Sequence, residues 1–216
     1  MRVLVTRPEP AASRTAARLR KLGHDAVVAP LLIPRAVPWR APDGDWQAVA
    51  FTSAVAPAFG GPGLAALTGL PAYAVGGATG DAARAAGFAD IRVAMGDASA
   101  VFAHATCDGV SRLLHLAGAD RSDAVVPPGL TVGVVTVYAA DLAETLPTDD
   151  YDLVLLYSAR TAAQFAALFA GDRARVAVAA LSPAIAAQLG ADWANIAVAA
   201  APTEDALFAA ARLACK

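Results

Sequence analysis

One short phrase occurs twice in this chain of 216 residues. Residues 49–59, VAFTSAVAPAF, read as an apolar strand that ends in Thr52 and Ser53 and is followed by the start of a helix. Residues 154–165, VLLYSARTAAQF, repeat the same order around Ser158. A strand that is apolar on both faces needs helices packed on both sides, as in a parallel sheet. The phrase therefore predicts an α/β protein with a hydroxyl at the end of a buried strand.

Strand and helix candidates alternate along the whole chain, which is the pattern of α/β folds. The predicted strands are short aliphatic runs: 3–6, 26–29, 48–52, 72–75, 91–94, 113–116, 132–138, 153–157, 176–180 and 196–199. The predicted helices are alanine-rich and include 11–22, 78–86, 161–170, 184–189 and 204–213. Alanine favours helix at little cost in side-chain entropy, and its small side chain lets helices pack closely on a sheet.

Further echoes indicate an internal duplication. ADIRVA at 89–94 matches ANIAVA at 194–199, and residues 22–32 weakly resemble residues 128–138. The chain then consists of four segments in the order a, b, a′ and b′, which are residues 2–32, 47–102, 112–138 and 152–212.

Two segments depart from this pattern. Residues 30–42 hold four prolines, and residues 134–147 start as a strand and then lose order. Proline cannot donate to a sheet ladder and stiffens an extended chain, so we interpret both segments as connectors between domains. Segment a would then fold with b′, and b with a′, which makes one domain discontinuous. Two domains in series, divided near residue 110, are the alternative.

The composition restricts the functional class. The chain is 57% hydrophobic with a formal net charge of −2, whereas a nucleic-acid-binding protein usually has a basic excess. Its two cysteines, Cys107 and Cys215, lack the spacing of a metal site or a disulfide framework, which indicates unpaired thiols in a reducing compartment. No segment has the pattern of a signal peptide or a membrane span. We therefore expect a soluble, cytoplasmic protein without nucleic-acid or membrane partners.

Polar or small residues follow the predicted strands at their carboxyl ends, where open α/β sheets bind ligands. These residues are Thr6, Arg7, Thr52, Ser53, Gly76, Gly77, Thr79, Ser158, Ala159, Arg160, Ser182 and Pro183. Helices follow them, and helix N-termini favour anions. A single serine or threonine before a helix is commonly an N-cap. Because the pattern recurs in both halves, it predicts two rims that grip a polyanion.

Several catalytic motifs are missing from the sequence. It has no P-loop, no GxSxG serine elbow and no HExxH zinc motif. The glycine-rich segment 73–88, with Asp97 after it, is an incomplete dinucleotide fingerprint, because Val75 stands where a glycine is required. The three histidines are scattered, and we predict structural or solvent-facing roles for all of them: His24, His104 and His115.

Seven short segments, taken in order, resemble the uroporphyrinogen-III synthase family, and the likeness spans nearly the whole chain. They are VLVTRPEP near the start, FTSA at 51–54, VGGATGDAARAAGF at 75–88, VYAAD at 137–141, YSARTAAQF at 157–165, ALSPAIAAQL at 180–189 and APTEDAL at 201–207. Each motif is short and low in complexity, but together they are fairly specific. The sequence departs from the family's pattern at Val55, Gly80 and Ala184-Ile185, which puts individual contacts in doubt.

The resemblance implies a fold of two similar flavodoxin-like parallel-sheet domains, joined by a two-stranded connector, with the active-site cleft between them. The discontinuous domain would comprise residues 1–32 and 142–216, and the inserted domain residues 43–132. Residues 33–42 and 133–141 would be the connectors.

The resemblance also implies the reaction. The family closes the linear tetrapyrrole hydroxymethylbilane to uroporphyrinogen III, with inversion of the last pyrrole ring and loss of water, and needs no metal or organic cofactor. We expect a monomer that can contact the preceding enzyme of the pathway transiently. Two alternatives stay open, namely a tetrapyrrole- or polycarboxylate-binding module that has lost turnover, and a dinucleotide-dependent enzyme.

The resemblance assigns roles to individual residues. Tyr138 matches the family's tyrosine and is predicted to be the general acid that assists hydroxyl loss, although a packing role is the alternative. Thr79 would bind a carboxylate or the leaving hydroxyl. The predicted substrate-binding residues are Arg7, Thr52, Ser53, Gly76, Thr79, Ser158, Ala159, Arg160 and Ser182.

Overall fold

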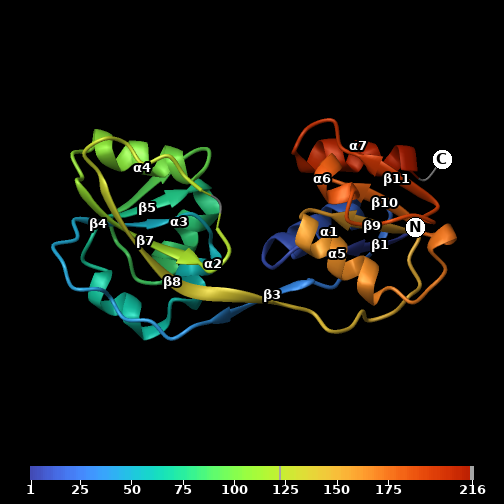
Figure 1. Cartoon of the computed structure of the whole chain (residues 1–216), viewed down its shortest axis with the longest axis horizontal. Coiled ribbons are helices and arrows are strands. Elements are labelled where there is room, and N and C mark those ends of the chain that lie inside the picture. The colour runs from blue at the N-terminus through green and yellow to red at the C-terminus, as the bar shows by residue number, and fades with distance from the viewer. Residues whose placement is uncertain (122, 215–216) are drawn as a thin grey trace. The chain divides into compact units, whose positions relative to one another are not determined.

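The computed structural model describes residues 1–121 and 123–214, which form two compact units. Unit 1 comprises Met1–Ile33 and Asp141–Lys216, and unit 2 comprises Pro34–Ala140. Each unit contains one sheet with helices on both faces (Figure 1). The prediction of an α/β fold with parallel sheets is confirmed.

Unit 1 contains a five-stranded sheet in the order β2-β1-β9-β10-β11, in which all neighbouring pairs are parallel. Its strands are β1 (Arg2–Val5), β2 (Asp25–Val28), β9 (Leu153–Leu156), β10 (Ala177–Ala180) and β11 (Asn195–Val198). Helices α1 (Ala11–Lys21) and α7 (Glu204–Ala214) share one core face of this sheet. Helices α5 (Ala159–Leu168) and α6 (Pro183–Ala186) pack on the other, and a short turn, η2 (Arg173–Arg175), precedes β10.

Unit 2 contains a six-stranded sheet in the order β3-β8-β7-β4-β5-β6. Its strands are β3 (Leu32–Ala36), β4 (Ala48–Phe51), β5 (Ala72–Val75), β6 (Ile91–Ala94), β7 (Arg112–Gly118) and β8 (Thr131–Leu142). Helices α2 (Val55–Phe59), η1 (Gly61–Leu67) and α3 (Gly76–Ala85) pack on one face of the sheet, and α4 (Ala98–Cys107) packs on the other.

The two sheets have matching strand orders once β3 is set aside. In unit 2 the order β8-β7-β4-β5-β6 corresponds, place by place, to β2-β1-β9-β10-β11 in unit 1. The strands of segments 2–32 and 152–212 therefore share one sheet, and those of 47–102 and 112–138 share the other. The repeated segments in the sequence therefore correspond to a repeated strand order in the structure.

The two segments expected to connect domains form the neighbouring strands β3 and β8. Residues 134–147 start as a strand and then lose order, as expected, but β8 is longer than the predicted strand 132–138 and continues to residue 142 beside β3. The backbone N–H of Val37, just after β3, donates to the carbonyl oxygen of Val137 at 3.2 Å. Pro34 is tolerated because β3 is an edge strand, where a missing N–H costs no ladder bond. The boundary between the units falls within both strands.

Small residues let the helices approach the sheets closely. Ala12 and Ala16 of α1 are fully buried against unit 1's sheet. Gly80 lies within α3, where a Cβ atom would stand 3.1 Å from Val93 and 3.4 Å from Ile91 of β6. A glycine in a helix costs about 1 kcal/mol relative to alanine, and here it permits this close helix–strand packing.

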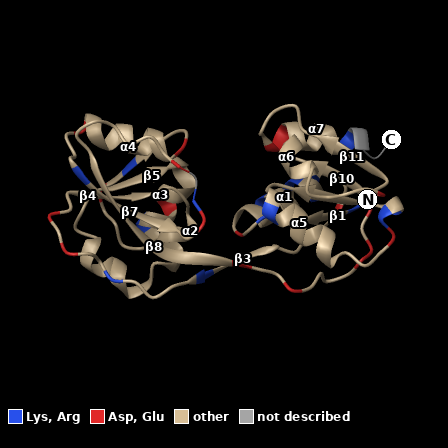
Figure 2. Ribbon diagram, viewed as in Figure 1, with Lys and Arg blue, Asp and Glu red and all other residues tan. Residues whose placement is uncertain are grey.

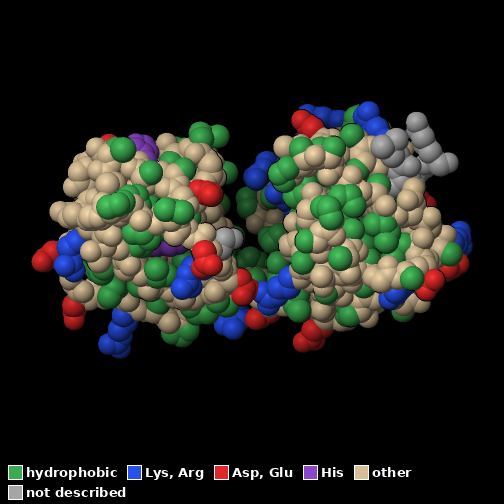
Figure 3. All heavy atoms as spheres, turned by 45° about the horizontal axis from the view of Figure 1, so that its top comes forward, with side chains coloured by type: hydrophobic (Ala, Val, Ile, Leu, Met, Phe, Trp, Pro, Cys, Tyr) green, Lys and Arg blue, Asp and Glu red, His purple; other side chains and the backbone are tan. Residues whose placement is uncertain are grey.

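The surface is mixed in character. Acidic and basic residues are interspersed over loops and helix ends (Figure 2). Hydrophobic side chains are scattered among polar ones on the face of each unit that Figure 3 shows. None of the described helices is both long and apolar enough to cross a membrane. Cys107 is an exposed free thiol, and Cys215 lies outside the described residues.

Replacing Gly133 of β8 with alanine tests how unit 2 packs. An alanine Cβ at this position would overlap the Trp46 ring, which Arg112 covers at 5.3 Å and whose Nε1 donates to the Pro42 carbonyl at 3.0 Å. Because the ring is held, Gly133→Ala should lower the free energy of unfolding by about 1–3 kcal/mol, measured by urea denaturation. Gly69→Ala is the control, since its Cβ would meet no atom within 4 Å. Equal stability of both variants would contradict this packing.

Candidate active site

A pocket of about 300 Å³ lies in unit 2, at the edge where the parallel strands of its sheet reach their carboxyl ends. Its lining comes from the ends of β4, β5, β6 and β7, from the loop after β7, and from two residues within strands, His115 of β7 and Tyr138 of β8. The other lining residues are Thr52, Ser53, Val75, Gly96, Asp97, Ala98, Gly118, Asp120 and Arg121. Open α/β sheets bind ligands at this edge. Three residues predicted from the sequence, Thr52, Ser53 and Tyr138, thus lie together.

A β-bulge aims Tyr138 into this pocket. Ala117 pairs with Thr136, but the next residue, Gly118, pairs with Tyr138, so β8 has one extra residue at this point. The extra residue, Val137, is fully buried in the core. Bulges re-aim side chains in this way and are frequent beside active sites.

Gly118 makes room for the tyrosine ring. A Cβ atom at Gly118 would lie 2.7 Å from the Tyr138 Oη and 2.9 Å from its Cε2. Only glycine therefore allows the ring to lie across the end of β7. Tyr138 is partly exposed and packs against the apolar cluster beneath the sheet.

His115 and Thr52 form a polar pair in the pocket wall. The His115 Nε2 lies 3.0 Å from the Thr52 Oγ1, and the histidine is only 4% exposed. Burial, with a smaller contribution from the nearby Arg121 cation, lowers the pKa of His115 to about 4. The imidazole is therefore neutral at physiological pH and acts as a hydrogen-bonding group. The prediction that this histidine is structural or solvent-facing missed its place in the pocket wall.

Two pocket residues also hold helix ends. The Ser53 Oγ accepts a hydrogen bond from the Val55 N–H at 3.2 Å, and an Asp97 carboxylate oxygen accepts one from the Ala100 N–H at 3.1 Å. The Asp97 contact is the capping role that was the structural alternative for such residues, whereas the Ser53 contact is a local turn bond just before α2. Among the described lining residues Arg121 is the one cation, beside the carboxylates of Asp97 and Asp120.

The other two residues predicted in unit 2 lie at the start of α3. Gly76 adopts a φ of +67°, which glycine reaches without strain. Thr79 is only 5% exposed, on the α3 face that packs on the sheet. The structure therefore places Gly76 at the strand-end edge and Thr79 within the packed interior.

The corresponding edge of unit 1 is occupied by an ion-pair network. The Arg7 guanidinium pairs with the Glu204 carboxylate at 3.2 Å and lies 4.5 Å above the Tyr157 ring. Thr15 and Arg18 also donate to Glu204. The predicted substrate cation Arg7 is thus already paired with a carboxylate of its own unit.

The network shifts two ionisation equilibria. Burial raises the pKa of Tyr157 to about 12, which keeps its hydroxyl protonated. Burial alone would also raise the pKa of Glu204, but the hydrogen bonds from Thr15 and Arg18 and the charges of Arg18 and Arg7 outweigh it and lower that pKa. Glu204 is therefore ionised at neutral pH.

The remaining predicted residues of unit 1 follow β9 and β10, which are neighbouring strands. Ser158 caps α5, since its Oγ accepts from the Thr161 N–H at 3.1 Å. Ala159 and Arg160 are exposed in the first turn of that helix. Ser182 precedes α6 and is partly exposed. The parallel strands bring these residues to one edge of the five-stranded sheet.

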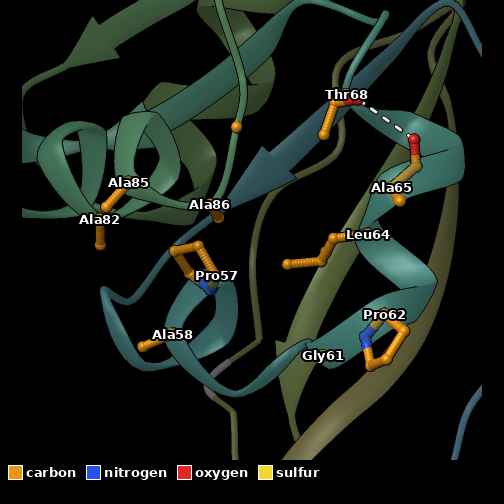
Figure 4. Close-up of a pocket in the computed structure, with 11 residues that line it drawn as sticks. Pro57, Ala58, Gly61, Pro62, Leu64, Ala65, Thr68, Ala82, Ala85 and Ala86 are labelled. Carbon is orange, nitrogen blue, oxygen red and sulfur yellow. Dashed lines mark hydrogen bonds between the residues drawn. The ribbon is translucent and has the colours of Figure 1, made fainter.

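A larger, apolar groove of about 630 Å³ lies elsewhere in unit 2 (Figure 4). It runs between α2, η1 and the C-terminal end of α3, and its lining includes Pro57, Leu64 and Ala82. Thr68 supplies its one hydroxyl, which donates to the Ala65 carbonyl at 3.1 Å. This lining offers no acid, base or nucleophile, so the groove is not the candidate active site.

Sequence reasoning missed three contributors to these sites, namely His115, Gly118 and Glu204. A histidine within the apolar strand LLHLAG, close to the strand's carboxyl end, was the available signal for His115. Within the described residues, no three His, Cys, Asp or Glu side chains are grouped so that they could hold a metal ion.

Known proteins resemble this chain over most of its length. A family model described as "Uroporphyrinogen-III synthase HemD" matches residues 13–209. A solved uroporphyrinogen-III synthetase from Helicobacter pylori 26695 is similar in fold, with 17% identity, a TM-score of 0.60 and 96% of each chain covered. The Thermus thermophilus uroporphyrinogen III synthase has 14% identity and a TM-score of 0.38, with 100% of both chains covered. Comparison with curated protein sequences gave no match.

The Glu204 network predicts an acid-sensitive contribution to stability. The pKa of Glu204 is lower in the folded protein, so its contribution is present above the ordinary carboxyl pKa of 4.5 and is lost as the pH falls below it. Glu204→Gln should lower the free energy of unfolding by about 1–2 kcal/mol at pH 7 and by less at acid pH, measured by urea denaturation. Glu144→Gln is the control, because Glu144 is exposed and lies outside this network. A loss for Glu204→Gln that does not change with pH would contradict the network.

Proposed function

The chain belongs to the uroporphyrinogen-III synthase family, and on this premise we propose that it cyclises hydroxymethylbilane to uroporphyrinogen III. The last pyrrole ring is inverted and one water is lost, which makes the enzyme a cyclising lyase of porphyrin and haem biosynthesis. The family match over residues 13–209 is the observation that carries the proposal. The pocket beside Tyr138 supports it, because it offers a proton donor at a ligand-binding edge.

In the proposed reaction Tyr138 protonates the departing hydroxyl. The bond between carbon and oxygen at the terminal hydroxymethyl group breaks, water leaves, and the pyrrole electrons stabilise the resulting azafulvene. A phenol O–H is a hydrogen-bond and proton donor. The last ring's substituted carbon then attacks to give a spiro intermediate. The bond from that carbon to its original bridge breaks and re-forms at the ring's other α-carbon, which inverts the ring, and the proton released from that carbon restores the Tyr138 phenol. Holding the two ends of the substrate together supplies an entropic advantage that can be large.

The eight carboxylates of the substrate require many donors. We propose that Thr52, Ser53 and Gly76 bind carboxylates at the edge of unit 2. Unit 1 would contribute Arg7, Ser158, Ala159, Arg160 and Ser182. Backbone N–H groups at helix N-termini add about 0.3–1 kcal/mol each for an anion. Thr79, which is buried, would reach substrate only if α3 shifts.

The finer description of the fold is also part of the proposal. The order β2-β1-β9-β10-β11 is that of a flavodoxin-like sheet, which supports two flavodoxin-like domains with β3 and β8 as their connector. A cytoplasmic monomer that needs no metal or organic cofactor, and that contacts the preceding enzyme transiently, stays a prediction.

The product isomer tests the proposed function. We expect the purified chain to convert freshly made hydroxymethylbilane mainly to the type III isomer, whereas spontaneous closure gives type I. Oxidation to porphyrins and chromatographic separation measure the ratio. Type I alone would overturn the proposal. Tight uroporphyrinogen binding without isomer III would instead indicate a binding module, and a melting temperature raised by NAD(P)H would indicate a dinucleotide site.

Replacement of Tyr138 and Gly118 tests the proton donor. Tyr138→Phe should lower kcat by about 10²-fold or more while product affinity is kept, because general acid catalysis contributes about 10²–10⁴-fold. Gly118→Ala should also lower kcat, because the added Cβ displaces the Tyr138 ring.

The double variant, Tyr138→Phe with Gly118→Ala, tests whether Gly118 affects kcat only through the position of the Tyr138 ring. With Tyr138 already replaced, Gly118→Ala should have little further effect, and Gly69→Ala should leave kcat unchanged. Unchanged turnover of Tyr138→Phe would assign the tyrosine to packing.

A further inference from the structure

We propose that His115 is a positioning residue of the unit 2 pocket. It holds the Thr52 hydroxyl so that this hydroxyl donates its hydrogen to a carboxylate or hydroxyl oxygen of the bound substrate. The inference rests on the proposed function, since it adds a residue to the same site.

The first support is that the imidazole is fixed on several sides. His115 lies in the middle of β7, which pairs with both β4 and β8. Its ring meets Phe102 of α4 edge to face, with 5.5 Å between centroids and 77° between planes. Phe102 is itself only 3% exposed. A ring held in this way restricts the rotation of the Thr52 side chain, whose Oγ1 is 3.0 Å from the His115 Nε2.

The direction of this hydrogen bond decides what the pocket can bind. A neutral imidazole has one N–H donor and one acceptor nitrogen. If Nε2 carries the hydrogen, it donates to the Thr52 Oγ1, and the threonine's own hydrogen is left for a ligand. If Nε2 is instead the acceptor, the Thr52 hydroxyl donates its hydrogen to His115, and that hydrogen is not available to a ligand. Because the substrate's side chains end in carboxylates, which only accept, we assign the hydrogen to Nε2.

The second support comes from the matching position in unit 1. His115 pairs with Ala50, two residues before Thr52, and Val5 pairs with Leu155, two residues before Tyr157. Val5 therefore stands in unit 1 where His115 stands in unit 2. Val5 is fully buried, so this sheet architecture packs well with an aliphatic residue at the position. The fold does not require a histidine there, which favours a role in the pocket.

Kinetics of five variants test the proposal, with wild-type isomer III formation measured in the same assay. His115→Val and Thr52→Val should each lower kcat/KM about tenfold, which is the loss of one hydrogen bond of about 1.4 kcal/mol. The double variant should lose no more than either single variant, because the histidine acts through the threonine. His115→Gln, which keeps a donor, should recover part of the activity. His104→Gln, at a partly exposed histidine of α4 that does not line this pocket, is the control.

The outcomes separate the two proposals. Additive losses in the double variant, with an active wild type, would overturn the role of His115 alone. A wild type that forms no isomer III would overturn the proposed function. In that case ¹⁵N chemical shifts of the His115 ring still test the positioning, because we expect a neutral ring with its hydrogen on Nε2 at pH 7. A hydrogen on Nδ1 alone, or a charged ring, would overturn it.

Discussion

Parallel strands that are buried on both faces leave only their ends for chemistry. In both units the helices cover the sheet on each side, so side chains along strands such as β9 are buried in the core and cannot contact a ligand. The carboxyl ends of the strands meet at one edge, and the helix N-termini that follow point their free N–H groups there. The position of the candidate site follows from this burial.

The same architecture has produced two unlike edges. In unit 1 the edge is filled by the Arg7–Glu204 pair and the Tyr157 ring, which are held by residues of α1 and α7. In unit 2 the matching edge is open, and the wall is formed by Thr52 and His115. The two units therefore share a strand order but differ in what lies at this edge.

The strands were predictable because burial on both faces leaves a clear aliphatic signal, as in β9, where all four residues are buried. The strand β3 was not predictable from the sequence. Pro34 suggests a connector, and among the described strands β8 is the one that pairs with β3. The pairing of Arg7 joins residues at opposite ends of the chain, and nothing local to Arg7 indicates Glu204. The β-bulge opposite Gly118 could not be predicted from local sequence either, because it depends on the register between β7 and β8.

The volume of the pocket limits what it can hold. About 300 Å³ is the lower end of the range for sites that enclose a small ligand, whereas a tetrapyrrole has four substituted rings. A pocket of this size can therefore enclose only part of a tetrapyrrole. Its two carboxylates and one arginine also make it a poor site for a dense cluster of negative charge. With a net charge of −2 the chain has no excess of cations for a polyanion, and the uncharged donors at its strand ends are N–H groups and hydroxyls such as those that follow β4 and β9.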